Sequence, residues 1–113
     1  MNNETVKTIS GKVHYLQKVA LLPDSTLHVR LRNVTLRDVF PNELAVQIIP
    51  NAEKAGLNFN LTYSCADVLP GHTYAISASI TREDRLIFAT TQNHEVELSA
   101  DHVEEQEVLV SLV

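Results

Sequence analysis

The sequence is poor in cysteine, tryptophan and glycine, and each shortage excludes a class of function. Its single cysteine, Cys65, excludes an internal disulfide and any site built from several thiolates. There is no tryptophan, and three glycines in total cannot supply a glycine-rich loop that holds a phosphate on backbone amides. No GxSxG, P-loop, GxGxxG or HExxH motif is present. These absences favour a protein that is not an enzyme, with no catalytic residue and no cofactor.

Basic charge and long apolar runs are also scarce. Nine lysines and arginines against 14 acidic residues leave a net charge of −5, which argues against nucleic-acid binding. Arg30, Arg32 and Arg37 lie close together, and we expect them to form a solvated strand face. The longest apolar runs, 19–22 and 86–89, have about four residues, far fewer than the roughly 20 that span a bilayer.

Five histidines raise the question of a metal site. None of them is spaced as HxH or HxxxH. His14 and His28 fall on the predicted outward faces of neighbouring strands and could meet across a hairpin. Two histidines are too few for a structural zinc site, which takes four ligands, so we expect no metal site. Cys65 is expected to be a small, partly buried apolar side chain.

Alternation of apolar and polar residues is the signal that the sequence does contain. It is cleanest over 57–63, where every second residue is large and apolar, and this period of two predicts a half-buried strand. The segment 11–38 is predicted to be a strand, a turn at Pro23-Asp24-Ser25 and a second strand. The predicted strands are 6–15, 26–34, 43–49, 57–63, 72–81, 86–91 and 107–113.

Three local features refine these strands. Gly11 lies within the first strand, where a glycine predicts a bulge or a close backbone approach. The charged residues 82–85 are predicted to form a hairpin turn, and Pro70-Gly71 predicts another turn. In 43–49, Leu44, Val46 and Ile48 are expected to share one face.

About seven short strands without a long helix predict an all-β, single-domain β-sandwich with mostly antiparallel strands. The cysteine pair and core tryptophan of antibody domains are absent, so an Ig-like or transthyretin-like sandwich is expected. Residues 11–113 are assigned to this domain. Residues 1–10 are expected to be a flexible lead-in and the start of the first strand. An exposed edge strand leaves an edge-paired or domain-swapped homodimer open.

Two blocks of sequence resemble a known family. The first block comprises GKV at 11–13, KVALLPD at 18–24, the alternating strand 27–31 and NVT at 33–35; the second comprises 57–63, PGHTY at 70–74 and DRLIF at 84–88. Together they resemble the YscW-type pilotin lipoproteins of type III secretion and the related YbaY-type envelope lipoproteins.

The resemblance implies a small outer-membrane lipoprotein that binds the C-terminal tail of a secretin subunit and assists its targeting and assembly. Such a protein works at the periplasmic face of the outer membrane and contacts the membrane only through an N-terminal lipid anchor. The signal peptide and anchor cysteine are not present in this chain. A structural or protective envelope lipoprotein without a secretin partner is the alternative. A small hydrolase or metal-binding domain is a third class, which stoichiometric zinc binding would indicate.

Apolar residues that alternation does not require are the candidates for the partner-binding surface. A secretin tail would dock there as an added strand or as an amphipathic helix, without catalysis. The alternative is that these residues fill the ends of the sandwich. The surplus residues are Leu21, Leu22, Val39, Phe40, Ile49 and Ile87, of which the first five are expected to cluster and form the docking surface.

Overall fold

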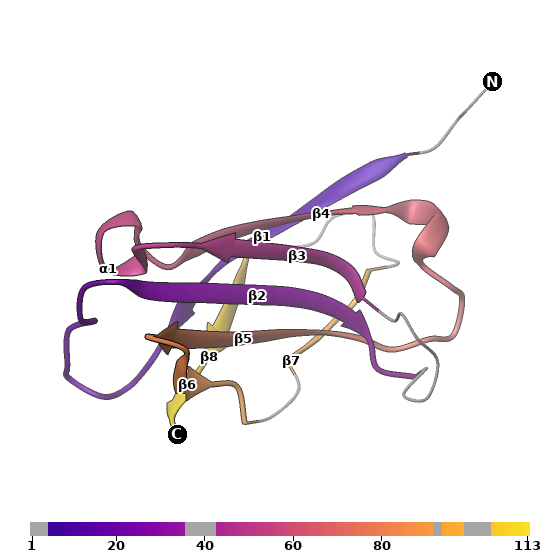
Figure 1. The fold of residues 1–113 in the computed structure, drawn as a ribbon. Helices are drawn as coiled ribbons and strands as arrows, with labels where there is room; N and C mark the ends of the chain where they lie inside the picture. The colour runs from indigo at the N-terminus through magenta and orange to yellow at the C-terminus, as the bar shows by residue number, and fades with distance from the viewer. Residues whose placement is uncertain (1–4, 36–42, 92–93, 99–104) are drawn as a thin grey trace.

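The computed structural model describes residues 5–35, 43–91, 94–98 and 105–113. It confirms the all-β sandwich: two sheets face each other across one hydrophobic core (Figure 1). Within these ranges the helical segments are short, α1 (Ala52–Ala55) and a 3-10 turn (Cys65–Asp67). The strands are β1 (Val6–His14), β2 (Ser25–Asn33), β3 (Glu43–Ile49), β4 (Asn58–Ser64), β5 (Tyr74–Arg82), β6 (Arg85–Ala89), β7 (His94–Val96), β8 (Gln106–Leu109) and β9 (Ser111–Leu112).

The first sheet has the order β4-β1-β8 and the second β3-β2-β5-β6-β9, with β7 also paired to β5. Only the β1–β8 pair is parallel among the described strands. The prediction that β1 and β2 are neighbouring strands is wrong, because they lie in different sheets. Residues 15–24 therefore cross between layers that lie about 10 Å apart in sandwiches. For the same reason, His14 and His28 do not meet across a hairpin.

Burial follows the predicted alternation on most strands. In β4, Phe59, Leu61 and Tyr63 point into the core and the intervening polar residues face outward. Leu27 and Leu31 in β2 are fully buried. Each such side chain contributes about 1.5–3 kcal/mol through removal from water. The core is therefore built from both sheets, as a sandwich requires.

Strand β3 is the edge strand of its sheet and has the predicted bounds. Of the three residues expected to share a face, Val46 and Ile48 do so, and that face is the outer one, because they pair with Arg30 and His28 of β2. The prediction is wrong for Leu44, which is partly buried against the core. Val46 is 52% exposed and Ile48 is 55% exposed. On its other side, β3 lies beside β4 of the opposite sheet (Figure 1). There, Gln47 Oε1 accepts a hydrogen bond from the Asn60 backbone amide at 2.7 Å.

Gly11 marks a close backbone approach, one of the two predicted outcomes. The β1–β4 register continues without a shift through Gly11, so there is no bulge in this pair. A Cβ atom at Gly11 would lie 2.2 Å from the backbone oxygen of Gln106 and 2.8 Å from Cζ of Phe59. Only glycine fits at this position, because the backbone of β8 and the ring of Phe59 occupy the space that a side chain would need.

The C-terminal segment joins the two sheets. The predicted last strand is split at Val110, with β8 in the first sheet and β9 paired to β6 in the second. Val110 itself is buried, and its amide donates a hydrogen bond to the carbonyl oxygen of His14 at 2.9 Å. This crossing places Leu112 beside β6, at the same end of the sandwich as the 15–24 segment.

The predicted hairpin turn between β5 and β6 is confirmed. Its two central residues, Glu83 and Asp84, both have positive φ, 53° and 63°. Positive φ at both positions is typical of a type I′ turn, whose twist matches that of the flanking strands. The turn brings Arg82 and Arg85 directly opposite each other as register partners.

Candidate functional site

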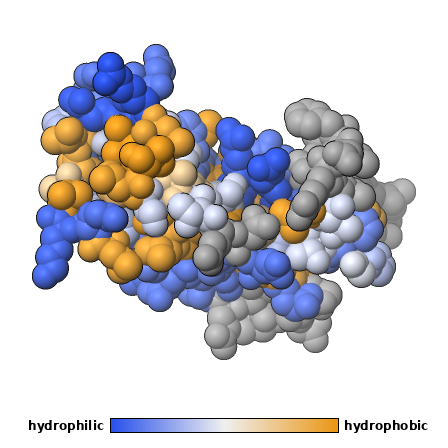
Figure 2. Space-filling model, turned by 90° about the horizontal axis from the view of Figure 1, so that it is seen from below, coloured by the Kyte–Doolittle hydropathy of each residue, from blue (hydrophilic) through white to orange (hydrophobic). Residues whose placement is uncertain are grey.

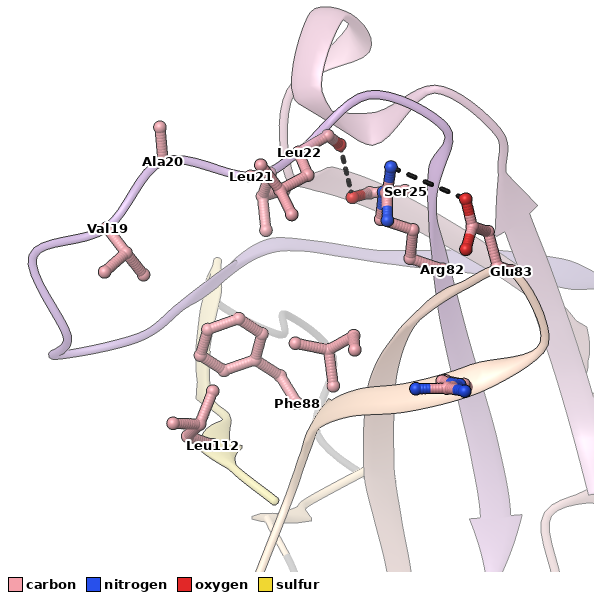
Figure 3. A pocket seen from close by; sticks show the side chains of 11 residues that line it. Val19, Ala20, Leu21, Leu22, Ser25, Arg82, Glu83, Phe88 and Leu112 are labelled. Atoms are coloured by element: carbon pink, nitrogen blue, oxygen red, sulfur yellow. Dashed lines mark hydrogen bonds and ion pairs between the residues drawn. The ribbon is translucent and has the colours of Figure 1, made fainter.

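An apolar groove of about 410 Å³ lies at one end of the sandwich, between the 15–24 segment, β6 and β9 (Figure 3). One wall is the crossing segment and the other is formed by β6 and β9. Polar groups line one end, where the β5–β6 turn lies. The lining residues are Val19, Ala20, Leu21, Leu22, Ser25, Arg82, Glu83, Arg85, Ile87, Phe88 and Leu112.

The wall formed by the crossing segment is held by hydrogen bonds to its backbone carbonyls. The Tyr15 hydroxyl donates to the carbonyl oxygen of Val19 at 2.6 Å, and the Tyr15 ring packs on Phe88 with centroids 4.6 Å apart. Arg82 Nε donates to the carbonyl oxygen of Pro23 at 2.8 Å. The wall is therefore fixed through its backbone while its apolar side chains remain available. A preformed wall lowers the entropy cost of binding.

Ser25 is the third anchor of this wall. It is buried, and its hydroxyl donates to the carbonyl oxygen of Leu22 at 2.6 Å. Its amide donates to Glu53 Oε1 on α1 at 3.1 Å. Desolvation raises the pKa of Glu53, but hydrogen bonds from the backbone of Glu53, Ser25 and Asp24, together with the positive charge of Lys54, lower it by more. The net result is a pKa below the ordinary value of 4.5.

We expect the hydrogen bond from the Ser25 amide to the Glu53 carboxylate to weaken in acid. Because the folded-state pKa is lowered, the stabilising contribution is present above the ordinary value of 4.5 and disappears as the pH falls through the folded pKa. In an NMR pH titration, the amide proton of Ser25 should therefore shift with a midpoint below 4.5. The Glu53→Gln variant should lack this transition; a midpoint at or above 4.5 would contradict the assignment.

Several side chains of the groove are exposed although they are large and apolar. Val19 is 55%, Leu22 59% and Leu112 57% exposed, whereas Phe88 at the groove floor is 2% exposed. Figure 2 shows hydrophobic side chains gathered at the left end of that view. Large contiguous apolar patches on protein surfaces are typical of sites of interaction with protein or membrane, which makes this surface a candidate for such a site.

The structure brings together some of the predicted docking residues. Leu21 and Leu22 line the groove, and so does Ile87, which was also identified as surplus. Ile49 lies on β3 opposite Leu27, partly buried against the core, and does not line the groove. Val39 and Phe40 lie outside the described residues, so the predicted five-residue surface remains a prediction.

Sequence reasoning missed Val19, Phe88 and Leu112 as groove residues. A signal for the first two was present, because they lie in the two longest apolar runs: all of 19–22 lines the groove, and so do Ile87 and Phe88 of the run 86–89. A continuous apolar run puts apolar side chains on both faces of a strand, so some of them are exposed where only one face is buried. Leu112 carried no such signal, since it fits the alternation of the last predicted strand.

The remaining histidines and Cys65 were also considered as candidates for a metal or catalytic site. In the part of the chain that the structure describes, no group of three or more His, Cys, Asp or Glu residues could hold a metal ion. His28 Nε2 lies 3.1 Å from the Thr81 hydroxyl and His94 Nε2 lies 2.7 Å from Gln106 Oε1. Cys65 begins the 3-10 turn and is partly buried, as predicted. Among the described helices, none has the length and apolar character needed to cross a membrane.

The fold and the groove define this chain as a small two-sheet β-domain with an apolar surface groove at one end. Comparison with protein families makes the assignment specific. Residues 4–110 match the family described as type III secretion system lipoprotein chaperone (YscW). The chain belongs to this family, as its sequence blocks predicted.

Two individual proteins are similar to this chain. The uncharacterized lipoprotein YbaY of Escherichia coli (strain K12) is 37% identical over 83 residues, which are 73% of this chain and 44% of YbaY. The matched region thus spans less than half the length of that relative. A solved structure of an alternative pilotin from the type II secretion system of Vibrio cholerae superposes with a TM-score of 0.84 at 26% identity, covering 96% of this chain and 98% of the other.

Proposed function

We propose that this domain is a pilotin of type III secretion. It binds the C-terminal tail of a secretin subunit in the apolar groove and assists the targeting and assembly of that subunit in the outer membrane. The observation that carries the proposal is the preformed groove in a domain whose fold matches a type II pilotin over almost its whole length. Membership of a lipoprotein chaperone family supports the same role and points to binding without catalysis.

The groove suits side-chain anchors better than strand addition. Its walls are formed by apolar side chains, whereas the edge of the second sheet beside it, β9, has only two residues. Burial of one leucine-sized ligand side chain contributes about 1.5–3 kcal/mol. A micromolar complex requires a net gain of about 8 kcal/mol after the costs of association. A tail segment therefore has to bury several apolar side chains along one face, as an amphipathic helix does.

The family name places the protein among lipoproteins, and we propose that the native protein works at the periplasmic face of the outer membrane. A lipid anchor would hold it there while the groove takes up the tail. The secretin subunit is then captured by one end and delivered to the membrane at which its ring assembles.

A titration of the folded domain with a synthetic peptide tests the proposal. The peptide is the C-terminal tail of the type III secretin encoded in the same genome, and a type II secretin tail serves for comparison. Saturable binding by calorimetry is expected, with NMR shifts at Leu21, Leu22, Ile87 and Phe88. Ile48 on the outer face of β3 should not shift. Absence of binding by a folded domain would overturn the proposal.

That negative result would favour the second candidate function, a structural or protective envelope lipoprotein without a secretin partner. The similarity to YbaY, a lipoprotein at 37% identity, is the observation in its favour. The two candidates differ in one property, because only the pilotin requires the groove to be accessible to a peptide.

A further inference from the structure

Two arginines face each other at one end of the groove. Arg82 ends β5 and Arg85 begins β6, and the two are register partners across the type I′ turn. Both line the groove. Like charges directly opposite on neighbouring strands are destabilising. The pair is therefore an unfavourable feature of the free domain, and it lies where a ligand would arrive.

The two arginines differ in how their charge is compensated. Arg82 donates to the carbonyl oxygen of Pro23 at 2.8 Å. It also lies 3.6 Å from a carboxylate oxygen of Glu83 (Figure 3). No carboxylate of the described residues lies within ion-pair distance of Arg85. In a chain of net charge −5, Arg85 is thus an uncompensated cation beside an apolar surface.

We propose that Arg85 selects ligands with an acidic side chain. The bound segment places a Glu or Asp carboxylate beside Arg85, at the end of the groove nearest the β5–β6 turn. Its apolar side chains pack towards Val19 and Leu112. This inference rests on the proposed function of the groove and names the chemistry of the partner that the groove accepts.

Geometry supports a carboxylate as the preferred group. A guanidinium presents its N–H donors in a planar fork that matches both oxygens of a carboxylate. The apolar groove floor excludes water from one side of the pair, which strengthens the attraction relative to bulk solvent. A carboxylate between the two strands also offsets the repulsion between Arg82 and Arg85. The pair would set the direction in which the segment lies, since only one end of the groove carries this charge.

A charge cycle on both partners tests the inference. The probe is the type III secretin tail peptide, together with variants in which each acidic residue is changed in turn to its amide. One of these changes should weaken binding to the wild-type domain about twofold to fivefold. Arg85→Gln should weaken binding of the unmodified peptide by the same factor, and the double change should add nothing further. Arg30→Gln, on the outer face of β2, is the matched control and should leave binding unchanged.

A second measurement needs no ligand. Arg85→Gln should raise the urea midpoint of unfolding because it removes the repulsion from Arg82, and the rise should shrink in high salt.

Peptide binding that is tight but insensitive to every charge change would overturn this inference and leave the pilotin proposal intact. A tail without any acidic residue, or one in which only amidation of the terminal carboxylate weakens binding, would also overturn it. Failure of every peptide to bind would overturn the proposed function and this inference together, whereas the urea result would still report on the arginine pair.

Discussion

Replacing Gly11 by alanine is expected to destabilise the domain by about 3 kcal/mol, near the upper end of the usual cost of overpacking. The added Cβ would lie 2.2 Å from the backbone oxygen of Gln106, and backbone cannot rotate away as a flexible side chain can. Either β8 moves away from β1 or β1 moves against Phe59. Both movements separate β8 from β1 in the three-stranded sheet. Equilibrium urea unfolding measures the loss.

Gly71→Ala is the matched control for this substitution. Gly71 has a φ of +80°, but a Cβ there would meet nothing within 4 Å. Its cost is therefore the conformational strain alone, about 1 kcal/mol. A Gly11→Ala variant that is no less stable than Gly71→Ala would show that the close approach of β1 and β8 is not required. NMR detection of intact β1–β8 contacts in Gly11→Ala would lead to the same conclusion.

Strands could be predicted from the sequence wherever one face of the strand is buried. The bounds of β3 were correct, and β4 was displaced by one residue from its prediction. The partition of strands between sheets could not be predicted in this way. Pro23-Asp24 indicates a turn before β2. The same residues would be found if the preceding strand paired with β2 in a hairpin or if it lay in the other sheet, so they do not distinguish the two arrangements. β1 lies in the other sheet because it pairs with β4 and β8, which are both distant from it in the sequence.

The groove was only partly predictable for a related reason. Surplus apolar character identified Leu21, Leu22 and Ile87, which lie in its walls. The same criterion selected Ile49, whose register opposite Leu27 turns it towards the core instead. Register depends on which strands pair, so exposure of a single residue on an edge strand does not follow from its local pattern. The charge of Arg85 was visible in the sequence, but its position opposite Arg82 at the groove became apparent only in the structure.

Leu22→Asp is expected to weaken binding of the secretin tail at least about 30-fold, because truncating a central apolar contact costs about 2 kcal/mol or more. The free energy of unfolding should change by less than about 0.5 kcal/mol, as for other exposed positions. Leu22 is 59% exposed, and the hydrogen bond from Ser25 reaches its backbone carbonyl rather than its side chain. Calorimetry and urea unfolding on the same samples separate the two effects. Leu22→Asn, which carries no charge, should also weaken binding if lost apolar contact is the cause.

Two neighbouring residues on β3 make this comparison decisive. Ile48→Asp is the control for surface charge: Ile48 is 55% exposed on the outer face, so binding and stability should both stay near wild type. Ile49→Asp should instead destabilise the fold by about 2–3 kcal/mol, since it places a carboxylate against Leu27 without a partner. Any loss of binding in that variant is therefore explained by unfolding. If Leu22→Asp binds the tail as tightly as Ile48→Asp does, the groove is not the docking site, because the two variants add the same charge at similar exposure and differ only in the face they occupy.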